Sequence, residues 1–205
     1  MLQRRRFSSY VARVVCRNCN HGWMNDRVES PAIPILKPMF LPLAGPIRPR
    51  PFKVAEQRAM ATWAFKVALL LPYKYIPPRD EAPWRIAAFY RFKRPPRGTY
   101  VWLGARGRGG AFPYMEAIHV YSDAPRKAKA LHEESEFVTF ALGHVVFRVL
   151  KGPRRLFYPG VSPEPRWGRW TRLWPSSGRN VIWPRAEFSF DELRREAAGI
   201  FTPPL

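Results

Sequence analysis

The segment VAEQRAMATWAFKVALLL, residues 54–71, constrains the fold more than any other part of this sequence. Its first half is amphipathic with helical spacing, and its second half is almost entirely apolar. A helix of this kind is stable only where other elements cover most of its surface, so we expect a core helix. Pro72 follows and is expected to end it. A chain of 205 residues is long enough to build one sizeable core around this helix.

Strand-like segments follow this helix, rich in β-branched and aromatic residues and separated by Gly, Pro and Asp. They are IAAFYRF (86–92), TYVWLG (99–104), AIHVYS (117–122), EFVTFAL (136–142), VVFRVL (145–150) and NVIWP (180–184). Gly143 and His144 predict a hairpin between two of them. Ser189 and Glu192 have the spacing of a capping box that begins a terminal helix. The sequence therefore predicts an α+β fold with one core helix and a mainly antiparallel sheet.

The first fifty residues differ in character from the rest. A strand is expected over residues 7–16, followed by a helix from Asn20, a good N-cap residue, to Glu29, with Pro31 ending it. Residues 31–52 carry seven prolines among apolar residues. Since proline disfavours helix interiors and central strands, we expect an extended connector over 31–52. The expected domains are a small unit at 1–30, this connector, and a basic α+β domain at 53–205.

The net charge of +20 favours a polyanionic partner, which can be DNA, RNA or an acidic membrane surface. A GC-rich genome explains why arginine outnumbers lysine, but it does not explain the excess of positive charge. No run of 18 apolar residues is present, which argues against a membrane span. The basic start makes a poor secretory signal, so we expect a soluble cytoplasmic protein. DNA is the partner we expect first, with RNA as an alternative.

Basic residues concentrate in four segments that we expect to be loops or loop edges: 91–98, 104–110, 151–155 and 166–175. The last segment, RWGRWTRLWP, interleaves arginine with tryptophan, a combination that grips phosphates and stacks on bases. A solvated rim with its tryptophans packed on the core is the plainer interpretation. The candidate nucleic-acid contacts are Arg166, Trp167, Arg169, Trp170 and Arg172.

The two cysteines of the chain, Cys16 and Cys19, form a Cys-x-x-Cys pair. Such a pair supplies two of the four ligands of a structural zinc site. It also suits a dithiol redox site at the start of a helix, where the helix dipole lowers the pKa of a thiol. Two inert, buried thiols are the third interpretation. The pair alone leaves all three open.

The residues CRNCNHGWMNDRVE (16–29) closely resemble the second zinc knuckle of HNH-like endonucleases of the actinobacterial type, with its Cys-x-x-Cys-Asn-x-Gly-Trp-Met pattern. The resemblance continues thinly through LKPMFLPL (36–43), MATWAFKVALLL (60–71), VWLG (101–104) and VIWP (181–184). It implies a ββα-metal module, in which a Cys-x-x-Cys pair on each side of a hairpin holds structural zinc. A histidine on that hairpin would activate water against a phosphodiester bond.

Carried over to this chain, the resemblance makes Cys16 and Cys19 zinc ligands and Asn20 a residue of a catalytic Mg²⁺ or Mn²⁺ site. Gly22, Trp23 and Met24 would be structural. No second Cys-x-x-Cys pair and no histidine precede Cys16. We therefore expect an incomplete module, N-terminally truncated through a start codon placed too late or through a genuine loss, and inactive as it stands.

Other groups could complete the zinc site. His21 adjoins the pair, while His119, His132 and His144 could approach from elsewhere in the chain. Two chains could also share one zinc ion, which would force a dimer. The sequence thus supports an HNH-like endonuclease that lacks its catalytic half. The alternatives are a non-catalytic nucleic-acid-binding protein and, behind it, a Cys-x-x-Cys thiol redox protein.

Overall fold

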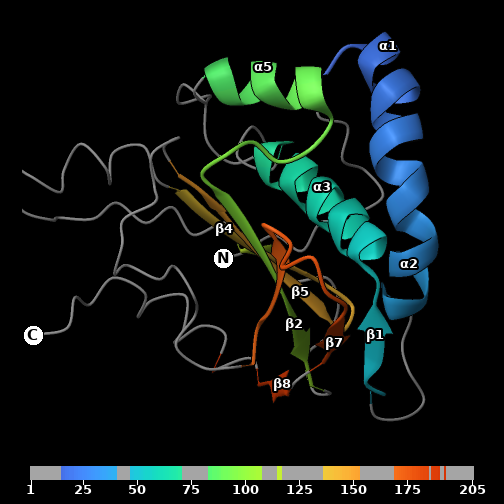
Figure 1. Ribbon diagram of the computed structural model, residues 1–205, viewed down its shortest axis with the longest axis vertical. Helices are drawn as coiled ribbons and strands as arrows, with labels where there is room; N and C mark the ends of the chain where they lie inside the picture. Colours follow the sequence, from blue (N-terminus) through green and yellow to red (C-terminus); the bar gives the residue numbers. More distant parts are fainter. Residues whose placement is uncertain are drawn as a thin grey trace, which may run out of the picture.

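A computed structural model describes residues 15–40, 47–70, 83–107, 115–116, 136–152, 169–184, 186–189 and 192. It confirms the α+β fold: helices pack against one face of a mainly antiparallel sheet (Figure 1). The predicted strand at 117–122 and residues 7–14 of the strand predicted at 7–16 lie outside the described residues, and Val15 and Cys16 are not in a strand. The expected division into domains stays a prediction.

The main sheet is built around two long neighbouring strands, β2 and β5, which pair in antiparallel register from Thr99–Lys151 to Ala105–Val145. Its order is β3-β4-β5-β2-β6, with β8 pairing parallel to β2 at the end of that strand. A second, two-stranded sheet joins β1 and β7. The strands are β1 (Arg50–Phe52), β2 (Thr99–Arg106), β3 (Met115–Glu116), β4 (Glu136–Leu142), β5 (Val145–Lys151), β6 (Thr171–Trp174), β7 (Val181–Trp183) and β8 (Glu187–Phe188).

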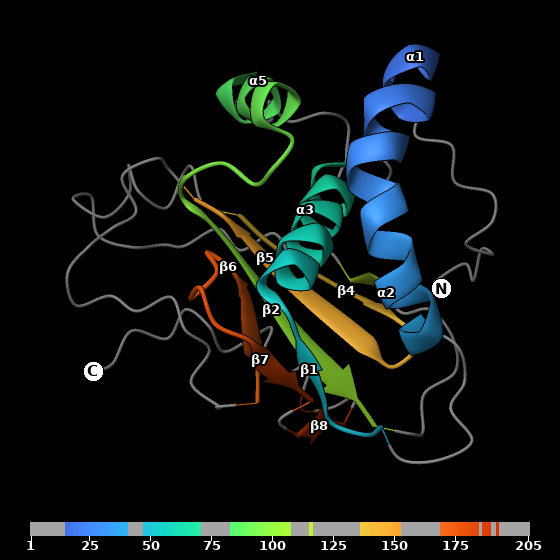
Figure 2. The same cartoon turned by 45° about the vertical axis from the view of Figure 1, so that its right-hand side comes forward.

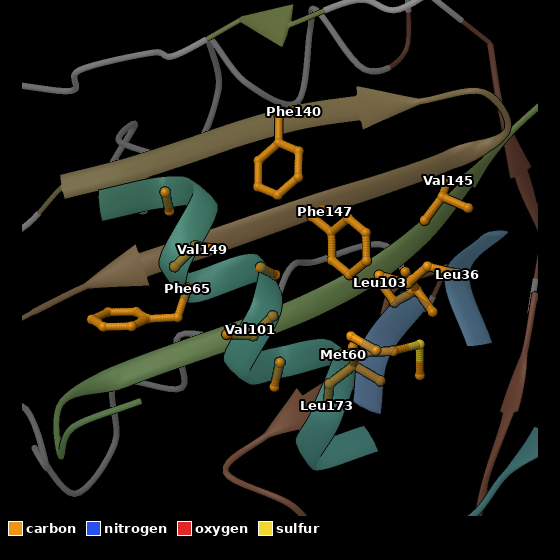
Figure 3. Packing of buried hydrophobic residues seen from close by; sticks show 14 of the residues in the cluster. Leu36, Met60, Phe65, Val101, Leu103, Phe140, Val145, Phe147, Val149 and Leu173 are labelled. Carbon is orange, nitrogen blue, oxygen red and sulfur yellow. The ribbon is translucent and has the colours of Figure 1, made fainter. Parts of the chain in front are cut away.

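The core helix α3 (Val54–Leu70) confirms the prediction for 54–71 and lies across the sheet. Side chains alternate along β2, so Val101 and Leu103 join the core under α3 while Trp102 joins a second apolar cluster. Figure 3 shows Met60 and Phe65 of α3 among the side chains that the strands direct toward the helix. This alternation explains why an almost wholly apolar helix is stable here: the sheet covers it.

The chain from Arg17 to Phe40 is helical on both sides of a kink at Gly22; we call it the helical rod, and it corrects two predictions. It runs through α1 (Arg17–Cys19), η2 (Asn20–Glu29) and α2 (Ser30–Phe40) (Figure 2). Gly22, with φ −92° and ψ −115°, is not helical and separates two helices there. Asn20 is therefore not the N-cap; Cys16 is. Pro31 does not end the helix, and the predicted extended conformation is wrong for residues 31–40.

The prolines are tolerated in α2 because of where they lie. Pro31, Pro34 and Pro38 are three and four residues apart, which places them on one helix face, and all three are exposed. The carbonyl groups that they leave unpaired can therefore bond to water. Ala32, Leu36 and Met39 line the opposite face and are buried. The helical spacing of these apolar residues outweighs the cost of the prolines.

The prediction of a strand at 86–92 is also wrong, because Pro83–Phe92 form helix α5. Pro83 suits the first position of a helix. Phe89 is buried four residues after the buried Arg85, a helical spacing, and its ring contacts Phe65 and Trp23 with centroids 5.2 and 5.4 Å away. Packing by this face overrides the β propensity of the aromatic residues.

Two further local predictions, the hairpin turn and the capping box, are confirmed. Gly143 and His144 form the β4–β5 hairpin, in which Leu142 pairs with Val145. Gly143 has a positive φ of 57°, and a Cβ there would lie 2.4 Å from the carbonyl oxygen of Phe40. The capping box is present, with Ser189 N–H donating to Glu192 Oε2 at 2.8 Å and Glu192 N–H to Ser189 Oγ at 3.2 Å. The helix that it would begin lies outside the described residues beyond 192.

Candidate metal centre

The cysteine pair opens the helical rod, at the end farthest from α2 (Figure 1). Cys16 is the N-cap and is exposed; Cys19, in the first turn, is half-buried. The Cys19 backbone N–H donates to Cys16 Sγ at 3.3 Å, and neither thiol is in a disulfide. Both sulfur atoms therefore lie on one helical turn, at the positive end of the helix dipole.

The two thiols differ in acidity. A hydrogen bond from the Cys19 thiol, together with the Cys19 backbone N–H, lowers the pKa of Cys16. The same thiol–thiol hydrogen bond raises the pKa of Cys19, while nearby Trp23 and the Lys93 ammonium act in the opposite direction. Deprotonation of one cysteine is thus favoured while metal is absent. A bound cation would favour the thiolate form of both, since metals bind thiolates.

Trp23 anchors this turn to α5. Its ring lies edge-on to Phe89 and to Tyr90, with centroids 5.4 and 5.8 Å away, and Lys93 Nζ lies 3.9 Å from its centroid. The Trp23 indole Nε1 is buried and has no partner at hydrogen-bonding distance and angle among the described residues. Trp23 therefore has a packing role, as the resemblance implied, and α5 lies directly beside the cysteine turn.

The described residues bring no further ligand to the pair. No group of three or more His, Cys, Asp or Glu is found within them. His21 follows the pair and is exposed, and Asn20, also exposed, donates its backbone N–H to the Cys16 carbonyl at 3.0 Å. His144 lies in the β4–β5 turn, where Nδ1 is 3.3 Å from the carbonyl oxygen of Arg106. His119 and His132 lie outside the described residues.

The chemistry of the pair fits half of a zinc site. Zinc prefers thiolates in tetrahedral geometry, and two sulfurs from one turn can occupy two of its four positions. One thiol of the pair is exposed and the other is half-buried, so both could reach a zinc ion at the start of the helix. The remaining ligands would have to come from outside the described part of the chain.

The predicted nucleic-acid contacts within 166–172 that the structure describes are largely engaged in contacts within the fold. Trp170 is only 5% exposed and its ring packs on Phe188 at 5.0 Å, so its faces are not available to a base. Arg169 donates to Glu192 at 2.9 Å, and Arg172 is a half-buried residue of β6. Arg166 and Trp167 lie outside the described residues. Residues 171–174 form strand β6, which the basic composition of this segment did not indicate.

Lys93 is the residue near the pair that the sequence analysis missed. The distance of 74 positions between Cys19 and Lys93 hides their proximity, which depends on α5 being a helix. The signal that could have revealed it is the four-residue spacing of Arg85 and Phe89, which is helical.

No helix among the described segments combines the length and the apolar character needed to cross a membrane. Comparison with protein-family models, curated proteins and solved structures finds no match to this chain.

Proposed function

We propose that this chain carries half of the zinc site of an HNH-like endonuclease and binds DNA in the cytoplasm. The observation that carries the proposal is the placement of Cys16 and Cys19 on one exposed helical turn, reduced and joined by an N–H···S hydrogen bond. The motif CRNCNHGWM and the net charge of +20 support the family and the partner.

Zinc would have a structural role at this position. It would fix the first turn of the helical rod to a second ligand pair, and such sites contribute directly to folding. Cys16 and Cys19 would hold it, and Trp23 would keep the turn packed on α5 through its edge-on contact with Phe89. The cytoplasm keeps thiols reduced, which this site requires.

Asn20 would serve a separate divalent cation, Mg²⁺ or Mn²⁺, as the family resemblance implies, and its exposure beside the cysteine pair is compatible with that role. Hydrolysis of a phosphodiester also needs a general base. The described histidines are His21 and His144, and His144 lies in the β4–β5 hairpin with a backbone partner. We therefore expect this chain alone to bind DNA without cutting it.

X-ray absorption at the zinc edge tests the proposal. The expected result is a sulfur shell at about 2.3 Å, which disappears in Cys19→Ser. His21→Ala is the matched control: it should keep the sulfur shell unchanged, because the thiols are the ligands. A shell of nitrogen and oxygen only, identical in wild type and Cys19→Ser, would refute the zinc site.

A non-catalytic nucleic-acid-binding protein is the second candidate, favoured by the charge alone. Its DNA affinity should fall steeply with salt because bound counterions are released. Nicking of duplex DNA is expected from neither candidate, so the zinc dependence of DNA binding separates them. DNA binding that is indifferent to zinc and to Cys19→Ser would favour the second candidate, whereas binding that weakens in Cys19→Ser would favour the first.

A further inference from the structure

The C-terminal end of α5 presents aromatic rings and cations together at the surface. Tyr90 is 57% exposed and Phe92 is 54% exposed. Arg91, Arg94 and Arg97 are exposed around them. We call these five residues the α5 patch. Large aromatic side chains are usually buried, so two exposed rings in neighbouring positions among cations indicate a binding surface.

The cations of the patch are arranged about one ring. The guanidinium carbon of Arg91 lies 5.3 Å from the Phe92 centroid, and that of Arg94 lies 5.8 Å from it. Both guanidinium groups lie over the ring, so a flat ligand that stacked on Phe92 would take their place there and would then have two guanidinium groups beside it. This pairs an aromatic platform with donors that suit phosphate oxygens.

The backbone holds the patch in place. Lys93 ends α5 with a left-handed φ of 52°, and its N–H donates to the Phe89 carbonyl at 2.9 Å. Pro95 and Pro96 are buried, and the Pro96 carbonyl accepts from Thr99 N–H at 3.3 Å at the start of β2. Ordering this surface would cost little on binding because its backbone is already fixed.

The positive charge of the patch is uncompensated within the described residues, where no acidic side chain pairs with its three arginines. The acids that do form ion pairs are Glu29, Glu56 and Glu192, whose partners are Lys66, Arg50 and Arg169. The described part of the patch is thus cationic, and a surface of this charge attracts anions.

We propose that the α5 patch binds unpaired nucleotides, with bases stacking on Phe92 and Tyr90 and phosphates bound by Arg91, Arg94 and Arg97. Bases in a duplex are stacked on one another, so a surface ring can stack only on a base that is free. The inference rests on the proposed function for its nucleic-acid partner and names the form of DNA that the protein would prefer.

The patch adjoins the cysteine pair. Lys93 Nζ lies 3.9 Å from the centroids of both Trp23 and Tyr90, so one ammonium contacts both the patch and the residue that anchors the cysteine turn. Single-stranded DNA bound along α5 would therefore pass close to Cys19 and Asn20. This position suits a protein that acts at junctions between paired and unpaired DNA.

Fluorescence anisotropy with a labelled single strand and its duplex tests the proposal. Wild type should bind the single strand more tightly, and Phe92→Ala with Tyr90→Ala should weaken that binding by roughly tenfold or more. Arg91→Gln with Arg94→Gln should lower the salt slope by about 1.4, at about 0.7 for each lost phosphate contact. Circular dichroism should show that both double variants fold, since the altered side chains are exposed.

Matched controls are Ile182→Ala, which removes an exposed apolar side chain far along the sequence, and Arg58→Gln, which removes an exposed charge on α3. Both should bind as wild type does. The inference is overturned if the patch variants match these controls, if duplex binding falls by the same factor, or if wild type binds only anionic phospholipid vesicles. Zinc content measured on the same samples separates this failure from failure of the zinc proposal.

Discussion

The two ends of the helical rod at 17–40 have opposite relations to the fold. At the α2 end, Ala32, Leu36 and Met39 are buried in the core beside α3. At the other end, Cys16, Asn20 and His21 are exposed. The α2 end is buried in the core, whereas the cysteine end is exposed and is held by the contact of Trp23 with Phe89 of α5. We therefore expect substitution of the exposed residues at the cysteine end to affect stability much less than substitution of the buried residues at the α2 end.

The largest contrast should come from one substitution at each end. Leu36→Ala should lower the free energy of unfolding by about 2–5 kcal/mol, because it leaves a cavity at a fully buried position. Asn20→Ala should change it by less than about 0.5 kcal/mol, as expected for an exposed site. Urea unfolding measures both. Equal losses at the two positions would remove the distinction between the ends.

The next largest loss of stability is expected where the β4–β5 hairpin contacts α2. Gly143→Ala should cost about 1–3 kcal/mol for its positive φ, and more because its Cβ would lie 2.4 Å from Phe40 O. Gly178→Ala is the matched control, since Gly178 also has a positive φ, of 76°, but open space around it. Thermal unfolding should show a clearly larger loss for Gly143→Ala. Similar losses would mean that the hairpin does not press on α2.

The middle of the rod is tied to α3 by the ion pair between Glu29 and the largely buried Lys66. Glu29→Gln should cost about 1–3 kcal/mol, because it leaves a buried ammonium without its charged partner. Adding Lys66→Met should recover part of that loss, because no buried charge is then left without a partner. A double variant less stable than Glu29→Gln would show that this pair is not what joins the two helices.

The smallest effect concerns the thiols and should leave stability unchanged. The hydrogen bond from Cys19 lowers the pKa of Cys16, so in zinc-free protein Cys16 should be alkylated faster near neutral pH. As pH rises, the rate at Cys16 should reach half of its maximum below the ordinary thiol pKa, and the rate at Cys19, whose pKa is raised, above it. Iodoacetamide labelling followed by mass spectrometry measures both rates. Identical pH midpoints would contradict the asymmetry.

Much of the fold follows from local patterns in the sequence. The apolar run at 54–71, the strands at 99–104, 136–142, 145–150 and 181–183, and the turn at Gly143 were predictable because hydrophobic period and turn residues agree there. The helices at 30–40 and 83–92 were not. In both, prolines or aromatic residues favour another conformation, and packing against α3 and Trp23 decides the outcome.

The candidate site was predictable only in part. The Cys-x-x-Cys spacing identified the thiols, but the prediction began the helix at Asn20, whereas Cys16 caps it and Cys19 lies in its first turn. The neighbouring cation, Lys93, comes from a distant segment. The tryptophans of 166–175 looked like stacking residues, yet Trp170 is core, because composition alone does not reveal the strand at 171–174.

The central claim is that Cys16 and Cys19 together bind zinc, and elemental analysis of the purified chain tests it most directly. The account predicts about one zinc ion per chain, or about one per two chains if two pairs complete one tetrahedral site. Cys19→Ser should lose the metal and His21→Ala should keep it. Zinc content at background in wild type, or equal in wild type and Cys19→Ser, would contradict the account.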